Sequence, residues 1–216
     1  MKLVRQSTYL ETAPFPHAVI DHLFPPGAIM EAEKEFLSED HPAWQRFSNS
    51  RELKSISNDL AVMGPFTKGL LATMCEPEIV DAIGEMAGIS RLIPDLHGGG
   101  MHLVPKGGKL GVHTDFNRGI NGYRRINALL FLNSNWDPAW GGNLELWAID
   151  RSRSVSVLPI ANRLVIFTSS SRSFHGHPHP LRCPPDRSRK SLAVYYFTKE
   201  PPVDVDEPRD TIFLDV

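Results

Sequence analysis

The spacing of apolar positions changes near residue 95, from a helical period to a strand period. Before this point apolar side chains recur three and four positions apart, as they do on one face of an amphipathic helix. The pattern predicts three helices: one after Pro25, one over residues 66–74 and one after Pro77 that ends near Gly88. Proline commonly begins a helix and glycine commonly ends one. We therefore expect a helical N-terminal part.

After residue 95 the apolar segments are short, and Gly, Pro, Asn or Asp separates them, which is typical of strands. Many short strands that follow amphipathic helices favour a mainly β (α+β) fold, a sandwich or jelly roll with the helices on one sheet. The stretch 169–188 is rich in Ser, Pro and Arg and is interpreted as a loop. The expected strands lie near 101–105, 109–113, 125–133, 143–148, 154–158, 163–168 and 189–198.

Two of these segments predict which faces of the sheet are covered. Segment 125–133 is apolar at both odd and even positions, so it should be a central strand buried on both faces. In segment 189–198, residues two positions apart share a face. Leu192 and Val194 can then pack on the helices, while Arg189 and Ser191 point to the opposite side of the sheet.

Composition narrows the class of protein without identifying it. A chain of 216 residues with 16 Gly and 18 Pro fits a single turn-rich domain rather than a helical bundle. A net charge of −2 offers no basic surface for nucleic acid or anionic membrane, and no apolar run is long enough to span a bilayer. The N-terminus lacks an apolar signal core, and the two cysteines form no disulfide framework. We expect a cytoplasmic protein without nucleic-acid or membrane partners.

The first candidate for chemistry is His113-Thr114-Asp115. On a strand, His113 and Asp115 project from the same face. An imidazole and a carboxylate, joined by one further histidine, form the 2-His-1-carboxylate set that binds Fe(II) and leaves positions open for substrate and O₂. A single His-x-Asp triplet is also common in surface turns, so a second group is needed.

The second group follows the segment 163–168. His175, His177 and His179 lie in the Ser- and Pro-rich stretch, and Arg189 with Ser191 begins the last apolar segment. A buried arginine requires an anion, and an arginine with a hydroxyl on the same face suits a carboxylate. The alternatives are a solvated polar loop for the histidines and a surface cation for the arginine.

Together these groups resemble the Fe(II)/2-oxoglutarate-dependent dioxygenase superfamily, nearest to its prolyl 4-hydroxylase-like branch. The resemblance rests on the order His-x-Asp, then Gly-Gly-x-Leu, then a later His, then Arg-x-Ser, and it covers residues 98–198, about half of the chain. It is carried by GGKLGVHTDFN (107–117), RRINALLFLNSNWDPAWGGNLELW (124–147), RLVIFTSSSRSFHGHPHPL (163–181) and RKSLAVYYF (189–197).

The resemblance implies a double-stranded β-helix (jelly roll) with the iron ligands His113, Asp115 and His175. His179 is the alternative distal ligand, because it lies nearer the family's usual distance from the arginine. Halogenating relatives replace the carboxylate ligand with a small residue, so the presence of Asp115 favours hydroxylation.

The resemblance also implies that Arg189, helped by Ser191, binds the distal carboxylate of the cosubstrate 2-oxoglutarate. The family often has a tyrosine where this chain has Phe131, which removes one expected hydrogen bond. Asn127, on the same predicted face as Phe131, could supply it, and so could Tyr195; either could equally be a wall residue.

The implied reaction is hydroxylation of an unactivated C–H bond with Fe(II), 2-oxoglutarate and O₂, which releases succinate and CO₂, with ascorbate as a supporting reductant. The substrate would be a prolyl residue of a protein or peptide, or a free amino acid or other small metabolite. In the resembling enzymes the loop after the His-x-Asp closes over substrate. Arg118 and Arg124 in the corresponding loop 116–125 could contact a carboxylate or a peptide backbone, or the loop could be an ordinary solvated hairpin.

Two other functions fit parts of the pattern. A cupin-like metal dioxygenase without 2-oxoglutarate would use His175, His177 or His179 as extra ligands and give Arg189 no role. A noncatalytic β-helix would retain the ligands for binding alone. In each case we expect one domain over 1–216, with a helical support at 1–95, the β-helix at 96–198, catalytic if the chain is an oxygenase, and a C-terminal tail at 199–216.

Overall fold

The computed structural model describes residues 8–115, 118–119, 122–202 and 211–215. Its strands are β1 (His17–Asp21), β2 (Gln45–Ser48), β3 (Glu52–Ser57), β4 (Ile93–Val104), β5 (Lys109–Thr114), β6 (Arg118–Gly119), β7 (Gly122–Phe131), β8 (Leu144–Trp147), β9 (Ser154–Val157), β10 (Arg163–Thr168), β11 (Phe174–His177), β12 (Arg189–Thr198) and β13 (Ile212–Leu214). Its helices are α1 (Pro26–Lys34), α2 (Pro65–Met74) and α3 (Pro77–Ala87), with short 3₁₀ turns at Tyr9–Glu11 and Pro138–Trp140. Among the described residues, no helix combines the length and the apolar character that a membrane crossing requires.

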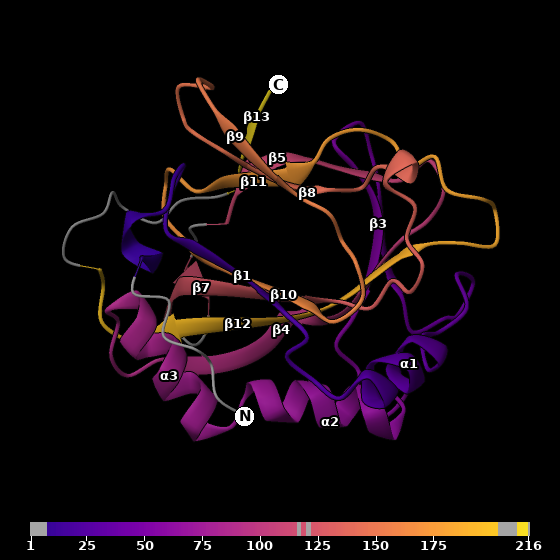
Figure 1. The fold of residues 1–216 in the computed structure, drawn as a ribbon, viewed down its shortest axis with the longest axis horizontal. Helices are drawn as coiled ribbons and strands as arrows, with labels where there is room; N and C mark the ends of the chain where they lie inside the picture. Colours follow the sequence, from indigo (N-terminus) through magenta and orange to yellow (C-terminus); the bar gives the residue numbers. More distant parts are fainter. Residues whose placement is uncertain (1–7, 116–117, 120–121, 203–210, 216) are drawn as a thin grey trace.

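The strands form two facing layers, with the helices beneath one of them (Figure 1). Strands β1, β10, β7, β12 and β4 make the layer next to the helices, and β5, β11, β8 and β9 make the other. Strand β3 joins the layers because it pairs with both β4 and β5. The expected class, a mainly β jelly roll with helices on one sheet, is confirmed.

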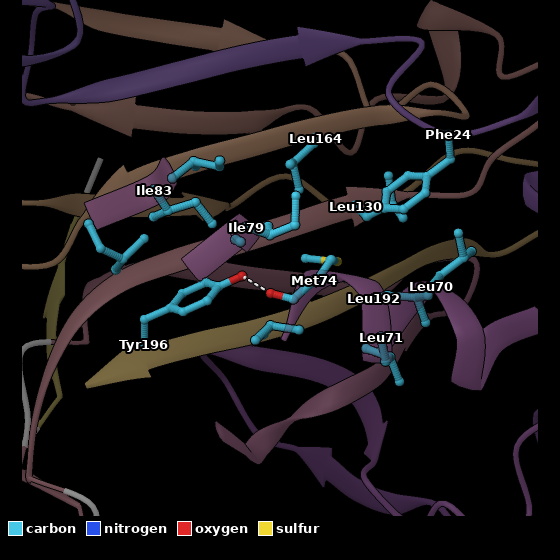
Figure 2. Packing of buried hydrophobic residues seen from close by; sticks show 14 of the residues in the cluster. Phe24, Leu70, Leu71, Met74, Ile79, Ile83, Leu130, Leu164, Leu192 and Tyr196 are labelled. Carbon is cyan, nitrogen blue, oxygen red and sulfur yellow. Dashed lines mark hydrogen bonds between the residues drawn. The ribbon is translucent and has the colours of Figure 1, made fainter. Parts of the chain in front are cut away.

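The helices follow the sequence signals. Each of α2 and α3 has a proline in its first turn, and α3 ends at Gly88, which has a φ of 66°. Only glycine adopts this left-handed conformation without steric cost. The buried faces of α2 and α3 pack on the layer of strands next to them, against Leu130, Leu164, Leu192 and Tyr196 (Figure 2).

Strand β7 is covered on both faces, as its pattern predicted. Ile126, Ala128 and Leu130 belong to the core under the helices. Phe131 belongs to a second core between the two layers of strands, together with Leu144, Leu146, Val165 and Phe167. Beside this second core, the space between the two layers is lined by polar side chains of β5, β7, β11 and β12.

One buried hydrogen bond joins the helical layer to the sheet. The hydroxyl of Tyr196 donates to the carbonyl oxygen of Met74 over 2.8 Å (Figure 2). Met74 ends α2, where backbone carbonyls lack partners within the helix. Tyr196→Phe should lower the free energy of unfolding by about 1 kcal/mol, because the carbonyl stays buried without a donor. Urea denaturation measures this. Tyr123→Phe is the control, because the Tyr123 hydroxyl makes no hydrogen bond within the described ranges. An equal loss of unfolding free energy in both variants would contradict the role of the bond.

The structure corrects the sequence interpretation in four places. Residues 1–95 are not only helical, because β1, β2 and β3 also lie there. The stretch 169–188, interpreted as a loop, contains β11, and the C-terminal tail contains β13. Strands β2 and β3 pair with each other in a local hairpin, whose short strands carry no clear apolar alternation. Strands β1, β11 and β13 are short and pair with segments far away in the sequence, so local patterns do not reveal them. The strand expected near 101–105 begins earlier, at Ile93, so Gly98–Gly100 lie inside β4, opposite an irregularity in its pairing with β12.

Candidate active site

His113, Asp115 and His175 form the one group of side chains that could hold a metal ion in the part of the chain that the structure describes. Their ligand atoms all lie within 4.8 Å of one another. His113 lies in β5 and is paired in register with His175 in β11, so the two imidazoles come from neighbouring strands. Asp115 follows β5, and its oxygens lie 3.4 Å from Nε2 of each histidine. The three side chains therefore direct their ligand atoms toward one common point, where a metal could bind.

Backbone contacts hold both imidazoles in the orientation that metal binding needs. Nδ1 of His113 lies 2.8 Å from the carbonyl oxygen of Gly111, and Nδ1 of His175 lies 3.0 Å from that of Ser173. A carbonyl only accepts, so Nδ1 carries the hydrogen and the Nε2 lone pair stays available. A metal-binding histidine usually donates its second N–H in this way. Burial, followed by the neighbouring His113, lowers the pKa of His175, which favours the neutral form that binds metals.

Arg124 is the cation that compensates Asp115. Burial alone would raise the pKa of Asp115, but the charge of Arg124 and the two imidazoles hold it well below its usual range. Nη2 of Arg124 lies 2.9 Å from Oδ2 of Asp115, and its Nε donates to Oδ1 of Asn127 over 2.7 Å. The guanidinium also lies 3.3 Å from the ring centroid of Tyr195. Arg124, expected as a substrate contact, is thus buried and paired with the Asp115 carboxylate.

Arg189 is a second buried cation, and within the described ranges it has no carboxylate partner. It opens β12, is 5 % exposed, and donates from Nε to the carbonyl oxygen of Gly142 over 2.7 Å. Its guanidinium lies 4.8 Å from the ring centroid of Phe131. No carboxylate among the described residues forms an ion pair with it. Burial lowers the pKa of Arg189 to about 9, which is the electrostatic signature of a cation that lacks an anion.

One cavity joins the metal group to this arginine. It has a volume of about 370 Å³ and is lined by His113, Asp115 and His175 together with Arg189 and Ser191. Ser191 shares the face of β12 with Arg189 and is buried, and its hydroxyl makes no hydrogen bond to any described residue. The donor set suits Fe(II), and the unpaired arginine with a free hydroxyl suits a carboxylate. The site therefore fits iron and 2-oxoglutarate.

The other expected residues divide between the cavity and the surface. Asn127 and Tyr195 line the cavity, but both contact Arg124. Arg118 is exposed on β6, lies over the ring of Tyr123 and is not among the lining residues. The expected substrate loop 116–125 lies partly outside the described residues, at 116–117 and 120–121. His179 is exposed and does not belong to the metal group.

The sequence analysis missed three polar residues of the cavity wall: Lys54, His102 and Thr211. Lys54 comes from β3, which was not predicted, and its Nζ lies 3.1 Å from Oε2 of Glu52. His102 comes from β4 and lies with Nε2 at 3.1 Å from the carbonyl oxygen of Gly98. Burial lowers the pKa of His102 to about 3, so it is neutral. The alternation of side chains along β3 and β4 gives the face on which Lys54 and His102 lie. It assigns them to the cavity only when the pairing of these strands with β5 and β12 is known.

Gly142 is required for the position of Arg189. A Cβ there would lie 3.1 Å from Cδ of Arg189 and 2.5 Å from Cδ2 of Leu181. Gly142→Ala should therefore displace the arginine and weaken 2-oxoglutarate binding about tenfold, at a cost of one charge-assisted hydrogen bond. Gly141→Ala is the matched control, because Gly141 has nearly the same φ (74° against 75°) but nothing within 4 Å of an added Cβ. Calorimetric titration of the Mn(II) form measures this, and equal affinities in the two variants would contradict the prediction.

A jelly roll with a 2-His-1-carboxylate group in its interior defines a class, the non-haem Fe(II) oxygenases. Comparison with protein families indicates which family within this class the chain resembles. Residues 99–197 match the model of the 2OG-Fe(II) oxygenase superfamily. This match and the metal group together support an oxygenase that uses Fe(II) and 2-oxoglutarate. No curated protein sequence matches the chain.

Solved structures support the fold. A Pseudomonas putida prolyl-4-hydroxylase is 21 % identical with a TM-score of 0.66, and the match covers 88 % of this chain and 97 % of that one. A Trichoplax adhaerens prolyl hydroxylase in complex with a hypoxia inducible factor oxygen degradation domain peptide fragment is 18 % identical with a TM-score of 0.69, covering 89 % and 87 %. HygX from Streptomyces hygroscopicus, with nickel, 2-oxoglutarate and hygromycin B bound, is 14 % identical with a TM-score of 0.57, covering 90 % and 87 %.

Proposed function

We propose that the chain is a hydroxylase of unactivated C–H bonds, with His113, Asp115 and His175 as its Fe(II) ligands and Arg189 as its 2-oxoglutarate anchor. The observation that carries this proposal is the buried Arg189, which pairs with no carboxylate of the described residues and lies in the same cavity as the three proposed ligands. A structural metal site would not need this cation. The presence of the Asp115 carboxylate supports hydroxylation rather than halogenation.

Each residue has a task in the proposed mechanism. The Nε2 atoms of His113 and His175 and the carboxylate of Asp115 hold the metal, and Arg124 keeps that carboxylate ionised and oriented. Arg189 and Ser191 bind the distal carboxylate of 2-oxoglutarate and thereby fix its keto acid end toward the metal. When bound, Fe(II) with 2-oxoglutarate supplies the O₂ chemistry, which side chains lack, and releases succinate and CO₂.

The proposed substrate class is that of the prolyl 4-hydroxylases: a prolyl residue in a protein or peptide, or a free amino acid or other small metabolite. The similarity in fold to two prolyl hydroxylases supports the first form. The similarity to HygX, which was solved with hygromycin B bound, supports the second.

The test is 2-oxoglutarate turnover with Fe(II), ascorbate and O₂, in the presence of proline-containing peptides, free amino acids or a metabolite extract. We expect succinate to form, and one component to gain the mass of one oxygen atom in proportion to it, measured by mass spectrometry. Asp115→Ala serves as the inactive control. A product that gains oxygen without consumption of 2-oxoglutarate would contradict the proposal.

A further inference from the structure

His177 is a buried side chain without a role in the site as described so far. It is 4 % exposed, and its Nδ1 is buried with no hydrogen-bond partner in the ranges that the structure covers. Buried polar atoms are nearly always paired, so an unpaired one in a cavity wall requires an explanation. A ligand of the cavity is one such explanation, because His177 lines the cavity that also contains Arg189.

Strand pairing places His177 at the end of β11 away from the metal group. His175 is opposite His113 on β5, whereas His177 is opposite Leu110, with an irregularity in register between them. Such bulges change the direction of a side chain and are frequent beside active sites. His175 and His177 are both buried and both line the cavity, so one serves the metal end and the other lies further along it.

The other end of the cavity is the arginine end. On β8, Gly176 is opposite Glu145, so His177 lies beside the residues that precede Glu145. These lead back to Gly142, whose carbonyl accepts the hydrogen bond from Arg189. His177 and Gly142 also line a neighbouring cavity of about 610 Å³, so His177 is part of the wall between the two spaces.

We propose that the imidazole N–H of His177 donates a hydrogen bond to the distal carboxylate of 2-oxoglutarate, beside Arg189. This inference rests on the proposed function, in which Arg189 anchors that carboxylate. A carboxylate can accept about four hydrogen bonds, so it can accept a further one besides those from Arg189 and Ser191. The ring of Phe131, which lies 4.8 Å from the guanidinium, contributes no donor.

Binding of two ligands to the Mn(II) form without O₂ tests the proposal. 2-Oxoglutarate carries the distal carboxylate, and 2-oxopentanoate has a methyl group in its place. In calorimetry or in competition against a bound probe, His177→Leu should weaken 2-oxoglutarate about tenfold and leave 2-oxopentanoate unchanged. His177→Gln, which keeps a donor, should recover most of the affinity. His179→Ala is the control from the exposed end of the same segment and should bind as wild type does.

Two results would overturn the inference. One is wild-type affinity for 2-oxoglutarate in His177→Leu. The other is an equal loss for both ligands, which would make His177 a packing residue of the wall. Failure of the wild-type protein itself to bind 2-oxoglutarate would be a different outcome, because it would overturn the proposed function from which this inference starts. Thermal unfolding without ligand identifies any variant that fails to fold.

Discussion

Replacement of Asp115 by alanine should abolish metal binding and succinate formation. Loss of a residue that only orients a ligand already costs ten- to a hundredfold in metal affinity or activity, so loss of the carboxylate ligand should cost more than about a hundredfold. The two imidazoles would remain, held by Gly111 and Ser173, but they would present an incomplete set. Calorimetry with Mn(II) and a succinate assay measure the two effects. Asp81→Ala, at an exposed position of α3, is the matched control.

The same change should also destabilise the fold, for a reason independent of iron. Arg124 would stay buried without its carboxylate, and an uncompensated buried charge costs about 3–5 kcal/mol. Adding Arg124→Leu removes that charge. The double variant should therefore recover most of the stability and none of the metal binding. Metal binding that returns with stability, or that never disappears in Asp115→Ala, would contradict the assignment of Asp115 as a ligand.

Replacement of Arg189 by methionine should have opposite effects on binding and on stability. Affinity for 2-oxoglutarate should fall about a hundredfold, because charge-assisted hydrogen bonds to the distal carboxylate are lost. Mn(II) affinity should not change. In the absence of ligand the variant should be at least as stable as the wild type, since a buried cation without an anion is replaced by an apolar side chain. Arg91→Met, at an exposed position, is the control.

The sign of the pH dependence follows from the lowered pKa of Arg189. Burial lowers this pKa from 12.5 to about 9, so between these values the unfolded chain binds more protons than the folded one. Arg189 therefore lowers the free energy of unfolding most below about pH 9, and this destabilisation decreases as the pH rises from about 9 toward 12.5. 2-Oxoglutarate should give the same relief at neutral pH by supplying the anion. If the ligand stabilises Arg189→Met as much as the wild type, the role of Arg189 is wrong.

The sequence predicted those elements whose causes are local. The helices α2 and α3 follow from apolar spacing, an initial proline and the terminal Gly88, and the burial of β7 follows from its continuous apolar run. Strand β11 was missed because its composition, Phe-His-Gly-His, has no strand pattern. It becomes a strand by pairing with β5 and β8, which no local pattern reveals.

The candidate site divides in the same way. The order of His113, Asp115, His175 and Arg189 in the sequence indicated the superfamily, which is now confirmed, while their individual roles stay predictions. The pairing of Arg124 with Asp115 was missed, because it depends on how the start of β7 lies against the residue after β5. The contact of Arg189 with the Gly142 carbonyl was missed because it joins segments 47 positions apart.

The most direct test of this account is a crystal structure of the protein grown without O₂ in the presence of Mn(II) and 2-oxoglutarate. We predict an anomalous peak for the metal between His113, Asp115 and His175, and the distal carboxylate of 2-oxoglutarate against Arg189 and Ser191. A metal bound elsewhere, or 2-oxoglutarate bound without contact to Arg189, would contradict the central claim that these residues form one oxygenase active site.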